Sequence, residues 1–214
     1  MNDIPRPAEF ALNSSVLFEW LSALFAAPPS ARAIAAYRRG PVAALLAALA
    51  TDEVLAAGAS AMSQALASPG SDTTLAAKLS RAFALLFEGL GGPNTASPYE
   101  SFHRCGGRLF QAPAAEMEAL LAARDLSVAR DAAEPADHLS IELALTSQLY
   151  LVDDLATAQM IARLANWIPA FSAACAAADI SNFWTGAAQL LSAVVEREKR
   201  QLQLTETVIK GDPK

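Results

Sequence analysis

The stretch Glu134-Pro-Ala-Asp-His-Leu-Ser-Ile-Glu-Leu143 places four ionisable side chains at the start of an apolar segment that runs to Leu151. We expect a helix to begin here, because proline fits the first helical turn and an aspartate near a helix start is favoured by the helix dipole. His138 and Glu142 are four residues apart and would share one face of that helix, which would orient the imidazole and favour its charged form. A plain acidic helix start with a solvated histidine is the alternative.

The rest of the chain predicts one helix after another. Pro28-Pro29 ends a first helix that Asn13 or Ser14 caps, and Ser30 caps a short second helix that stops at Gly40. No run rich in Val, Ile and Thr alternates with polar residues, so no strand is predicted and the fold class is all-α, a compact multi-helix bundle. Further helices are expected over 41–50, after Thr51-Asp-Glu53 as far as Ser68, from Asp72 or Thr73 to Phe87, and over 113–124, 155–166 and 182–202. Asp153-Asp154 is expected to form a bend and to cap the helix over 155–166.

Two loop signals interrupt these helices. Gly89-Leu-Gly-Gly-Pro93 is followed by Asn94, whereas a phosphate-binding loop needs Lys-Ser or Lys-Thr after its last glycine, so a helix stop is favoured over nucleotide binding. Ser97-Pro-Tyr-Glu100 predicts a capping box, with Ser97 at the N-cap, Pro98 at the first helical position and Glu100 at the third.

Composition excludes several classes of protein. The 214 residues carry a net charge of −6 and a sequence pI near 4.9, which does not suit nucleic acid as a partner. No stretch approaches about 18 apolar residues in a row, so we expect no stable membrane insertion. The N-terminus lacks a secretory signal and the two cysteines, Cys105 and Cys175, suit free thiols, so the predicted location is the cytoplasm.

Several motifs together resemble a known family. The Pro-Ala-Asp-His-Leu run and the following Glu142-Leu143 resemble the E-P-x-D-H-L…E-L signature of the TorD/DmsD/NarJ-like chaperones, which help redox enzymes mature. Other segments match that family in the same order, from Ser80 to Leu202: Phe83-Ala-Leu-Leu-Phe87-Glu-Gly89, Ser97-Pro-Tyr-Glu-Ser101, Trp167-Ile-Pro-Ala-Phe171 and Phe183-Trp184. The chain departs from the family at Arg163, where a histidine is frequent, and at Trp184, where a tyrosine is usual.

The resemblance implies a TorD-like bundle with a hinge before the Asp-His-Leu helix. We expect an N-terminal lobe over 1–124, a hinge or linker over 125–133, a C-terminal lobe over 134–204 and a loose tail over 205–214. Members of the family exchange halves across such a hinge, so a monomer and a domain-swapped dimer both stay open.

The resemblance also implies a cytoplasmic, system-specific chaperone without catalytic activity. Its partners would be the twin-arginine leader and the apo-form of the catalytic subunit of a molybdenum-cofactor oxidoreductase, and it would aid cofactor insertion and delay export. The molybdenum cofactor belongs to the client, no metal is expected in the chaperone, and weak guanine nucleotide binding is left open.

The expected leader-binding residues fall into two groups. Carboxylates would pair with the leader arginines, and aromatic and aliphatic side chains would wall a groove for its apolar helix. Core packing is the alternative for Phe83 and Phe87. The residues are Glu134, Asp137, His138, Leu139 and Glu142 of the central stretch, with Phe83, Leu86, Phe87, Ser97, Pro98 and Tyr99. On this interpretation, replacing Asp137 and His138 by alanine would weaken leader binding and leave stability nearly unchanged.

An enzyme is the alternative function. Glu100 and His103 form a Glu-x-x-His pair, the spacing with which helical bundles bind a di-iron or di-manganese centre. A second such pair is missing, because Pro135 stands three residues before His138.

Overall fold

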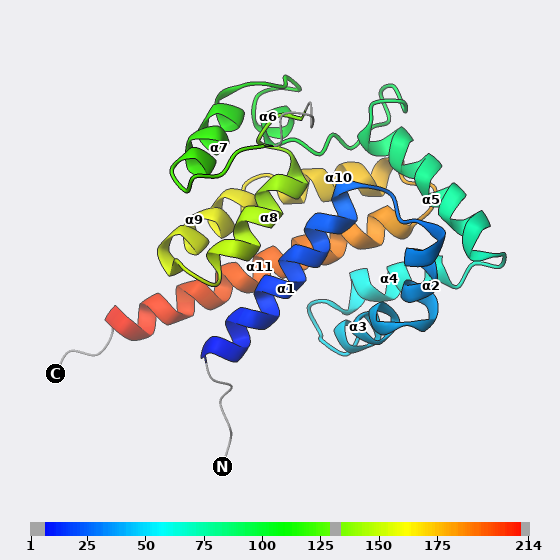
Figure 1. The fold of residues 1–214 in the computed structure, drawn as a ribbon, viewed down its shortest axis with the longest axis horizontal. Coiled ribbons are helices and arrows are strands. Elements are labelled where there is room, and N and C mark those ends of the chain that lie inside the picture. The colour runs from blue at the N-terminus through cyan, green and yellow to red at the C-terminus, as the bar shows by residue number, and fades with distance from the viewer. Residues whose placement is uncertain (1–6, 129–133, 211–214) are drawn as a thin grey trace, which may run out of the picture. The chain divides into compact units, whose positions relative to one another are not determined.

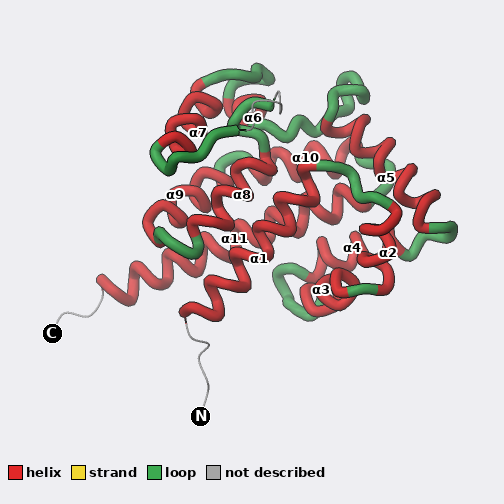
Figure 2. The backbone as a smooth tube through the Cα atoms, viewed as in Figure 1, coloured by secondary structure: helices red, strands yellow, loops and turns green. Residues whose placement is uncertain are grey.

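The computed structural model describes residues 7–128 and 134–210, and places side chains within 14–128 and 134–204. Over these residues the chain forms eleven helices and no strand, which confirms the predicted all-α class (Figures 1 and 2). Among the described residues, no helix has an apolar stretch long enough to cross a bilayer. The helices are α1 (Pro7–Ala26), α2 (Ala31–Arg39), α3 (Pro41–Leu49), α4 (Ala56–Leu66), α5 (Asp72–Phe87), α6 (Glu100–Arg104), α7 (Ala112–Ala122), α8 (Leu139–Leu149), α9 (Asp154–Ala165), α10 (Ile168–Ala178) and α11 (Phe183–Lys210).

Two compact units alternate along the chain. Unit 1 comprises 1–26 and 98–164, and unit 2 comprises 27–97 and 165–214. This division differs from the consecutive lobes 1–124 and 134–204, which stay a prediction, and residues 129–133 of the expected hinge lie outside the described residues. The expected loose tail is helical as far as Lys210, where α11 ends, and residues 211–214 are again outside the described range.

In unit 1, α1 packs along α8, and serines join the two helices (Figure 1). The Ser15 hydroxyl lies 2.9 Å from the Ser147 carbonyl, and the Ser147 hydroxyl lies 2.9 Å from the Ser15 carbonyl. Farther along, the Ser22 hydroxyl donates to the carbonyl of Ser140 at 2.7 Å. Serine is small enough to let the two backbones approach, and each bond satisfies a polar group that would otherwise be buried without a partner. The apolar core beside α8 consists of Met117, Leu121, Ala136, Leu145, Leu149, Ala156 and Met160.

In unit 2, α4 and α11 cross with their backbones in contact. A methyl group on Gly58 would lie 2.4 Å from the Leu190 nitrogen and 2.8 Å from the Gly186 carbonyl oxygen. A methyl group on Gly186 would lie 2.8 Å from the nitrogen of Met62. Glycine is therefore required at both positions because no side chain fits between the helices.

The core of unit 2 is an aromatic cluster around Trp184. Its ring lies 5.2 Å from that of Phe83 and 5.4 Å from that of Phe87, both edge to face, and its indole N–H donates to the Leu79 carbonyl at 3.2 Å. Phe87 also packs against Phe171, with ring centroids 5.8 Å apart. The departure from the family's usual tyrosine is thus accommodated by a buried hydrogen bond.

Several predicted helix ends are confirmed, and the predicted start of the first helix is wrong. Ser30 caps α2 by accepting from the Ala33 N–H at 3.2 Å, and α2 ends at Gly40 as expected. The Asp153 carboxylate likewise accepts from the Ala156 N–H at 2.9 Å at the start of α9. The first helix, however, begins at Pro7 and runs through Ser14, so the predicted cap there is wrong.

Candidate functional site

Residues 98–101 of the first motif and residues 134–139 of the second meet in unit 1 as a pair of short antiparallel segments. The Leu139 N–H donates to the Pro98 carbonyl at 2.8 Å, and the Glu100 N–H donates to the Asp137 carbonyl at 3.1 Å. Between these bonds, Tyr99 and His138 form an isolated β-bridge, with their rings 5.0 Å apart and edge to face. The bridge brings together two sets of predicted site residues that are distant in the sequence.

Asp137 is the cap of a helix to which it does not belong. Its carboxylate accepts from the Ser101 N–H of α6 at 2.7 Å, and the side chain is fully buried. The predicted capping box is wrong, because α6 begins at Glu100 with Tyr99 at the N-cap and no local side-chain cap. The extended path of Pro98 and Tyr99 along the central stretch explains this difference, since it leaves the first turn of α6 next to Asp137.

His138 is itself the N-cap of α8. Its Nδ1 accepts from the Ser140 N–H at 3.1 Å, so α8 begins at Leu139 and the expectation that Pro135 and Asp137 occupy its first turn is wrong. Burial lowers the pKa of His138 more than Glu134 and Asp137 raise it. The expected stabilisation of the charged imidazole is therefore wrong too, because removing the ring from water favours its neutral form.

Glu142 faces Arg163 rather than His138. One Glu142 oxygen lies 3.5 Å from Nε of Arg163, and the same guanidinium pairs with Glu100 of α6 and, at 2.9 Å, with Glu116 of α7. Arg163 also donates to the Pro113 carbonyl at 2.8 Å. This single side chain of α9 thus contacts α6, α7 and α8.

The buried pairing of Arg163 was not anticipated from the sequence, where the residue stood out only as a departure from the family. A signal exists, because the arginine follows two buried residues, Met160 and Ile161, on a helix whose next residue, Leu164, is also buried. A charge in such a position needs opposite charges around it, and Glu100 and Glu142 are both fully buried.

The Arg163 cluster also weighs against the di-metal alternative. The Glu100 carboxylate pairs with Arg104 as well as Arg163, so two guanidinium groups occupy the surroundings that a metal cation would need. Within the described residues, no group of three or more His, Cys, Asp or Glu side chains is arranged to hold a metal.

Glu134 is the exposed carboxylate of the central stretch and stands at the mouth of a pocket. The Tyr99 hydroxyl donates to one of its oxygens, and burial together with this carboxylate raises the pKa of Tyr99. The pocket, of about 480 Å³, is lined by apolar side chains and by polar ones that include Glu134 and His138. It is lined by Ser22, Ala26, Leu121, Leu126, Ser127, Val128, Glu134, His138, Ser140, Ile141, Ala144, Leu145 and Gln148.

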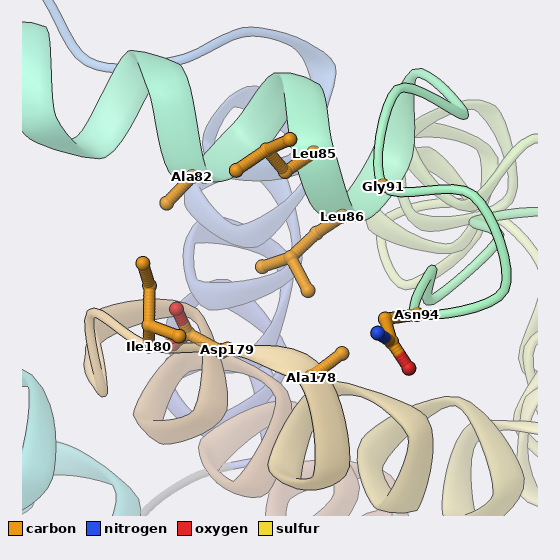
Figure 3. A pocket seen from close by; sticks show the side chains of 8 residues that line it. All are labelled: Ala82, Leu85, Leu86, Gly91, Asn94, Ala178, Asp179 and Ile180. Carbon is orange, nitrogen blue, oxygen red and sulfur yellow. The ribbon is translucent and has the colours of Figure 1, made fainter.

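The predicted apolar wall of the groove lies in unit 2 and is largely core. Phe83 and Phe87 are buried against Trp184, so a leader could reach them only if these helices moved apart. Leu86 is also buried, but it lines a smaller pocket of about 180 Å³ between α5 and the end of α10. Figure 3 shows Leu86 reaching from α5 toward Ala178, with Ile180 at the edge.

The remaining predicted residues have backbone and packing roles. Leu139 is fully buried and Pro98 is buried, and both take part in the bond that joins the two motifs. Ser97 is half-buried and ends the segment of unit 2 that precedes Pro98. Of the residues predicted in unit 1, only Tyr99, Glu134 and His138 combine partial exposure with a place at or beside the pocket.

The all-α fold and the meeting of these two motifs agree with the helical maturation chaperones that the motifs resemble. A family model described as nitrate reductase delta subunit matches residues 48–173, more than half of the chain. The chain belongs to this family, which includes the NarJ- and TorD-type chaperones for redox-enzyme maturation, and it is therefore a chaperone rather than an enzyme.

Curated relatives of this chain are also named as chaperones. The chain is 28% identical to the chaperone protein TorD of Vibrio cholerae over 199 residues, which cover 87% of this chain and 90% of the relative. It is 28% identical to the chaperone protein TorD of Aeromonas salmonicida over 212 residues, 92% of this chain and 94% of the relative. A TorD chaperone of Photobacterium profundum is 34% identical over 112 residues, 46% of this chain and 52% of the relative.

Proposed function

We propose that this chaperone binds the twin-arginine leader of a molybdenum-cofactor oxidoreductase at the pocket beside Glu134. In this proposal it holds the apo-form of the catalytic subunit in the cytoplasm, aids insertion of the molybdenum cofactor and delays export until the cofactor is in place. The cofactor belongs to the client, and the chaperone needs none of its own. Weak guanine nucleotide binding, and the choice between monomer and domain-swapped dimer, stay open within the proposal.

The observation that carries the proposal is an exposed carboxylate beside an apolar pocket. A leader presents arginine side chains followed by apolar residues. The Tyr99 hydroxyl donates to one oxygen of Glu134, and an exposed carboxylate is the group with which a guanidinium forms its strongest hydrogen bonds. The apolar side chains that line the pocket, which include Leu126, Ile141 and Leu145, match the aliphatic residues that follow the arginines.

The other carboxylates of the central stretch support the site indirectly. Asp137 holds the α6 N-terminus and Glu142 pairs with Arg163, and both are fully buried. Pairing either with a leader arginine would require it to leave its present partner. We therefore assign the direct contact to Glu134 and assign Asp137 and Glu142 to holding the bridged motifs in place.

Calorimetric titration of the full chain with leader peptides from candidate molybdoenzymes tests the proposal. We expect dissociation constants of about 1 μM or tighter, with weaker binding at higher salt because the arginine contacts are exposed to solvent. A peptide with both arginines changed to glutamine and a peptide of scrambled order are the matched controls. If no leader binds, or if the glutamine peptide binds as tightly as the native leader, the proposed site is wrong.

A further inference from the structure

Three large aliphatic side chains project into solvent at the turn between α8 and α9. Leu151 is 60% exposed, Val152 is 79% exposed and Leu155 is 71% exposed. The turn is held by its own backbone, since the Val152 and Asp153 N–H groups donate to the Leu149 carbonyl at 3.0 and 2.9 Å. Isolated exposed aliphatics are common on protein surfaces, but three within five residues on an ordered turn indicate a binding surface.

A small hollow in unit 1 lies beside this turn. It has a volume of about 120 Å³, a size that suits one aliphatic side chain, and it lies among α7, α8 and α9. Leu149 and Ala156, which flank the exposed turn in sequence, line it, and so does Gln159, one helical turn after Leu155. We call the three exposed side chains and this hollow the α8–α9 surface.

The exposed charges on the turn itself are acidic. Asp153 and Asp154 lie between the exposed aliphatic residues, and Asp153 caps α9 and lies 3.7 Å from Arg124. The two arginines that line the hollow, Arg124 and Arg163, are paired with carboxylates, Arg124 with Asp153 and Arg163 with three glutamates. A second copy of the chain would place aspartates against aspartates, and an anionic bilayer would be repelled in the same way. A segment that carries lysine or arginine next to apolar side chains would satisfy both the aliphatic residues and the carboxylates.

We propose that the α8–α9 surface binds a basic amphipathic segment of a partner polypeptide, separately from the pocket beside Glu134. One apolar side chain of the segment fills the hollow, others pack on Leu151, Val152 and Leu155, and its basic residues face Asp153 and Asp154. The proposal goes beyond leader binding and does not depend on it, because none of these residues lines the pocket that contains Glu134 apart from the shared core residue Leu145.

Fluorescence anisotropy with a labelled 18-residue Leu/Lys amphipathic peptide, on the order of one binding segment in length, tests the proposal on the full chain. The variant Leu151→Ser/Leu155→Ser should weaken binding by about tenfold, because it removes most of the exposed apolar area. Asp154→Asn should weaken binding by about threefold, and more at low salt than at high salt. Val16→Ser removes an aliphatic residue of α1 that is 52% exposed and should leave the affinity unchanged.

Four results would overturn the proposal. The double serine variant could bind the peptide as tightly as Val16→Ser does, or a Leu/Glu peptide of the same pattern could bind as tightly as the Leu/Lys peptide. Light scattering could show a dimer that the double serine variant dissociates, which would assign the surface to self-association. Co-sedimentation with phosphatidylglycerol vesicles that the double variant abolishes would assign it to lipid. Circular dichroism verifies folding, and unchanged leader binding by the double variant separates this surface from the pocket beside Glu134.

Discussion

The fully buried Asp137 shows why a residue of the signature stretch can be essential without touching a ligand. Its carboxylate accepts from the Ser101 N–H, so Asp137→Ala would leave the first turn of α6 uncapped in a dry environment. We expect the free energy of unfolding to fall by about 1–3 kcal/mol, the usual cost of a lost buried hydrogen-bond partner or helix cap. Urea denaturation followed by circular dichroism measures it, with the exposed Glu118→Ala as control. Unchanged stability together with weaker leader binding would instead make Asp137 a contact residue.

His138, at the same bridge, makes the free energy of unfolding depend on pH. Because burial lowers its pKa below the ordinary 6.5, the unfolded chain binds more protons than the folded chain as the pH falls through 6.5. The contribution of His138 is fully present above pH 6.5 and is lost as the pH falls toward its lowered folded pKa. Protonation also removes the lone pair with which Nδ1 accepts from the Ser140 N–H.

The substitution His138→Asn isolates this pH-dependent term, because asparagine can cap a helix and does not titrate. Thermal or urea unfolding between pH 7.5 and 5 should show a smaller loss of stability for the variant than for the native chain, across about two pH units. Equal losses in the two proteins would mean that groups other than His138 cause the pH dependence.

At the scale of helices, Arg163 of α9 pairs with the buried Glu100 of α6 and Glu142 of α8, and with the exposed Glu116 of α7. Arg163→Met would remove the cation that the buried Glu100 and Glu142 share, and we expect a loss of about 3–5 kcal/mol in the free energy of unfolding even though Glu100 keeps Arg104 as a partner. Adding Glu100→Gln and Glu142→Gln to Arg163→Met should recover much of that loss, because the buried negative charges are then removed. Chemical denaturation of the three proteins checks this expectation. A mild effect of Arg163→Met alone would show that water already reaches these carboxylates.

The close crossing of α4 and α11 predicts that any side chain larger than hydrogen at Gly58 clashes with the neighbouring backbone. Gly58→Ala places a methyl group 2.4 Å from the Leu190 nitrogen, which is backbone and cannot turn aside. The helices must separate, and we expect a loss of about 1–3 kcal/mol despite the higher helix propensity of alanine. Ala57→Leu adds a larger side chain on the exposed face of the same helix and should cost little. Equal melting temperatures for Gly58→Ala and the native chain would contradict the close crossing.

For the whole molecule, the sequence predicts the helical class and many helix ends because these depend on local chemistry. Ser30 and Asp153 cap helices that begin within three residues of them, and both predictions are confirmed. The cap that Asp137 supplies to α6 comes from a different segment of the chain, so no local pattern could predict it. The same limit explains why Glu142 was expected beside His138, whereas its partner Arg163 lies on another helix.

The sequence predicts which segments form the candidate site, but it does not predict which of their carboxylates face the pocket and which are buried with internal partners. The motifs identified the segments that form the bridge, and the charge pattern identified the carboxylates of the central stretch. Burial then separated Glu134, at the pocket, from Asp137 and Glu142, which have internal partners. Helical spacing also placed Phe83 and Phe87 on one face, but spacing is the same for a groove wall and for a core.

The central claim is that Glu134 binds an arginine of the client's leader, and a double-mutant cycle tests it most directly. Calorimetry would compare the native chain and Glu134→Gln, each with the native leader and with the leader carrying an arginine-to-glutamine change, and Glu53→Gln would serve as the matched acidic control. We predict that Glu134→Gln weakens native leader binding about tenfold and that the altered leader loses little further affinity with this variant. Fully additive losses, or an equal loss with Glu53→Gln, would contradict a direct contact between Glu134 and the leader arginine.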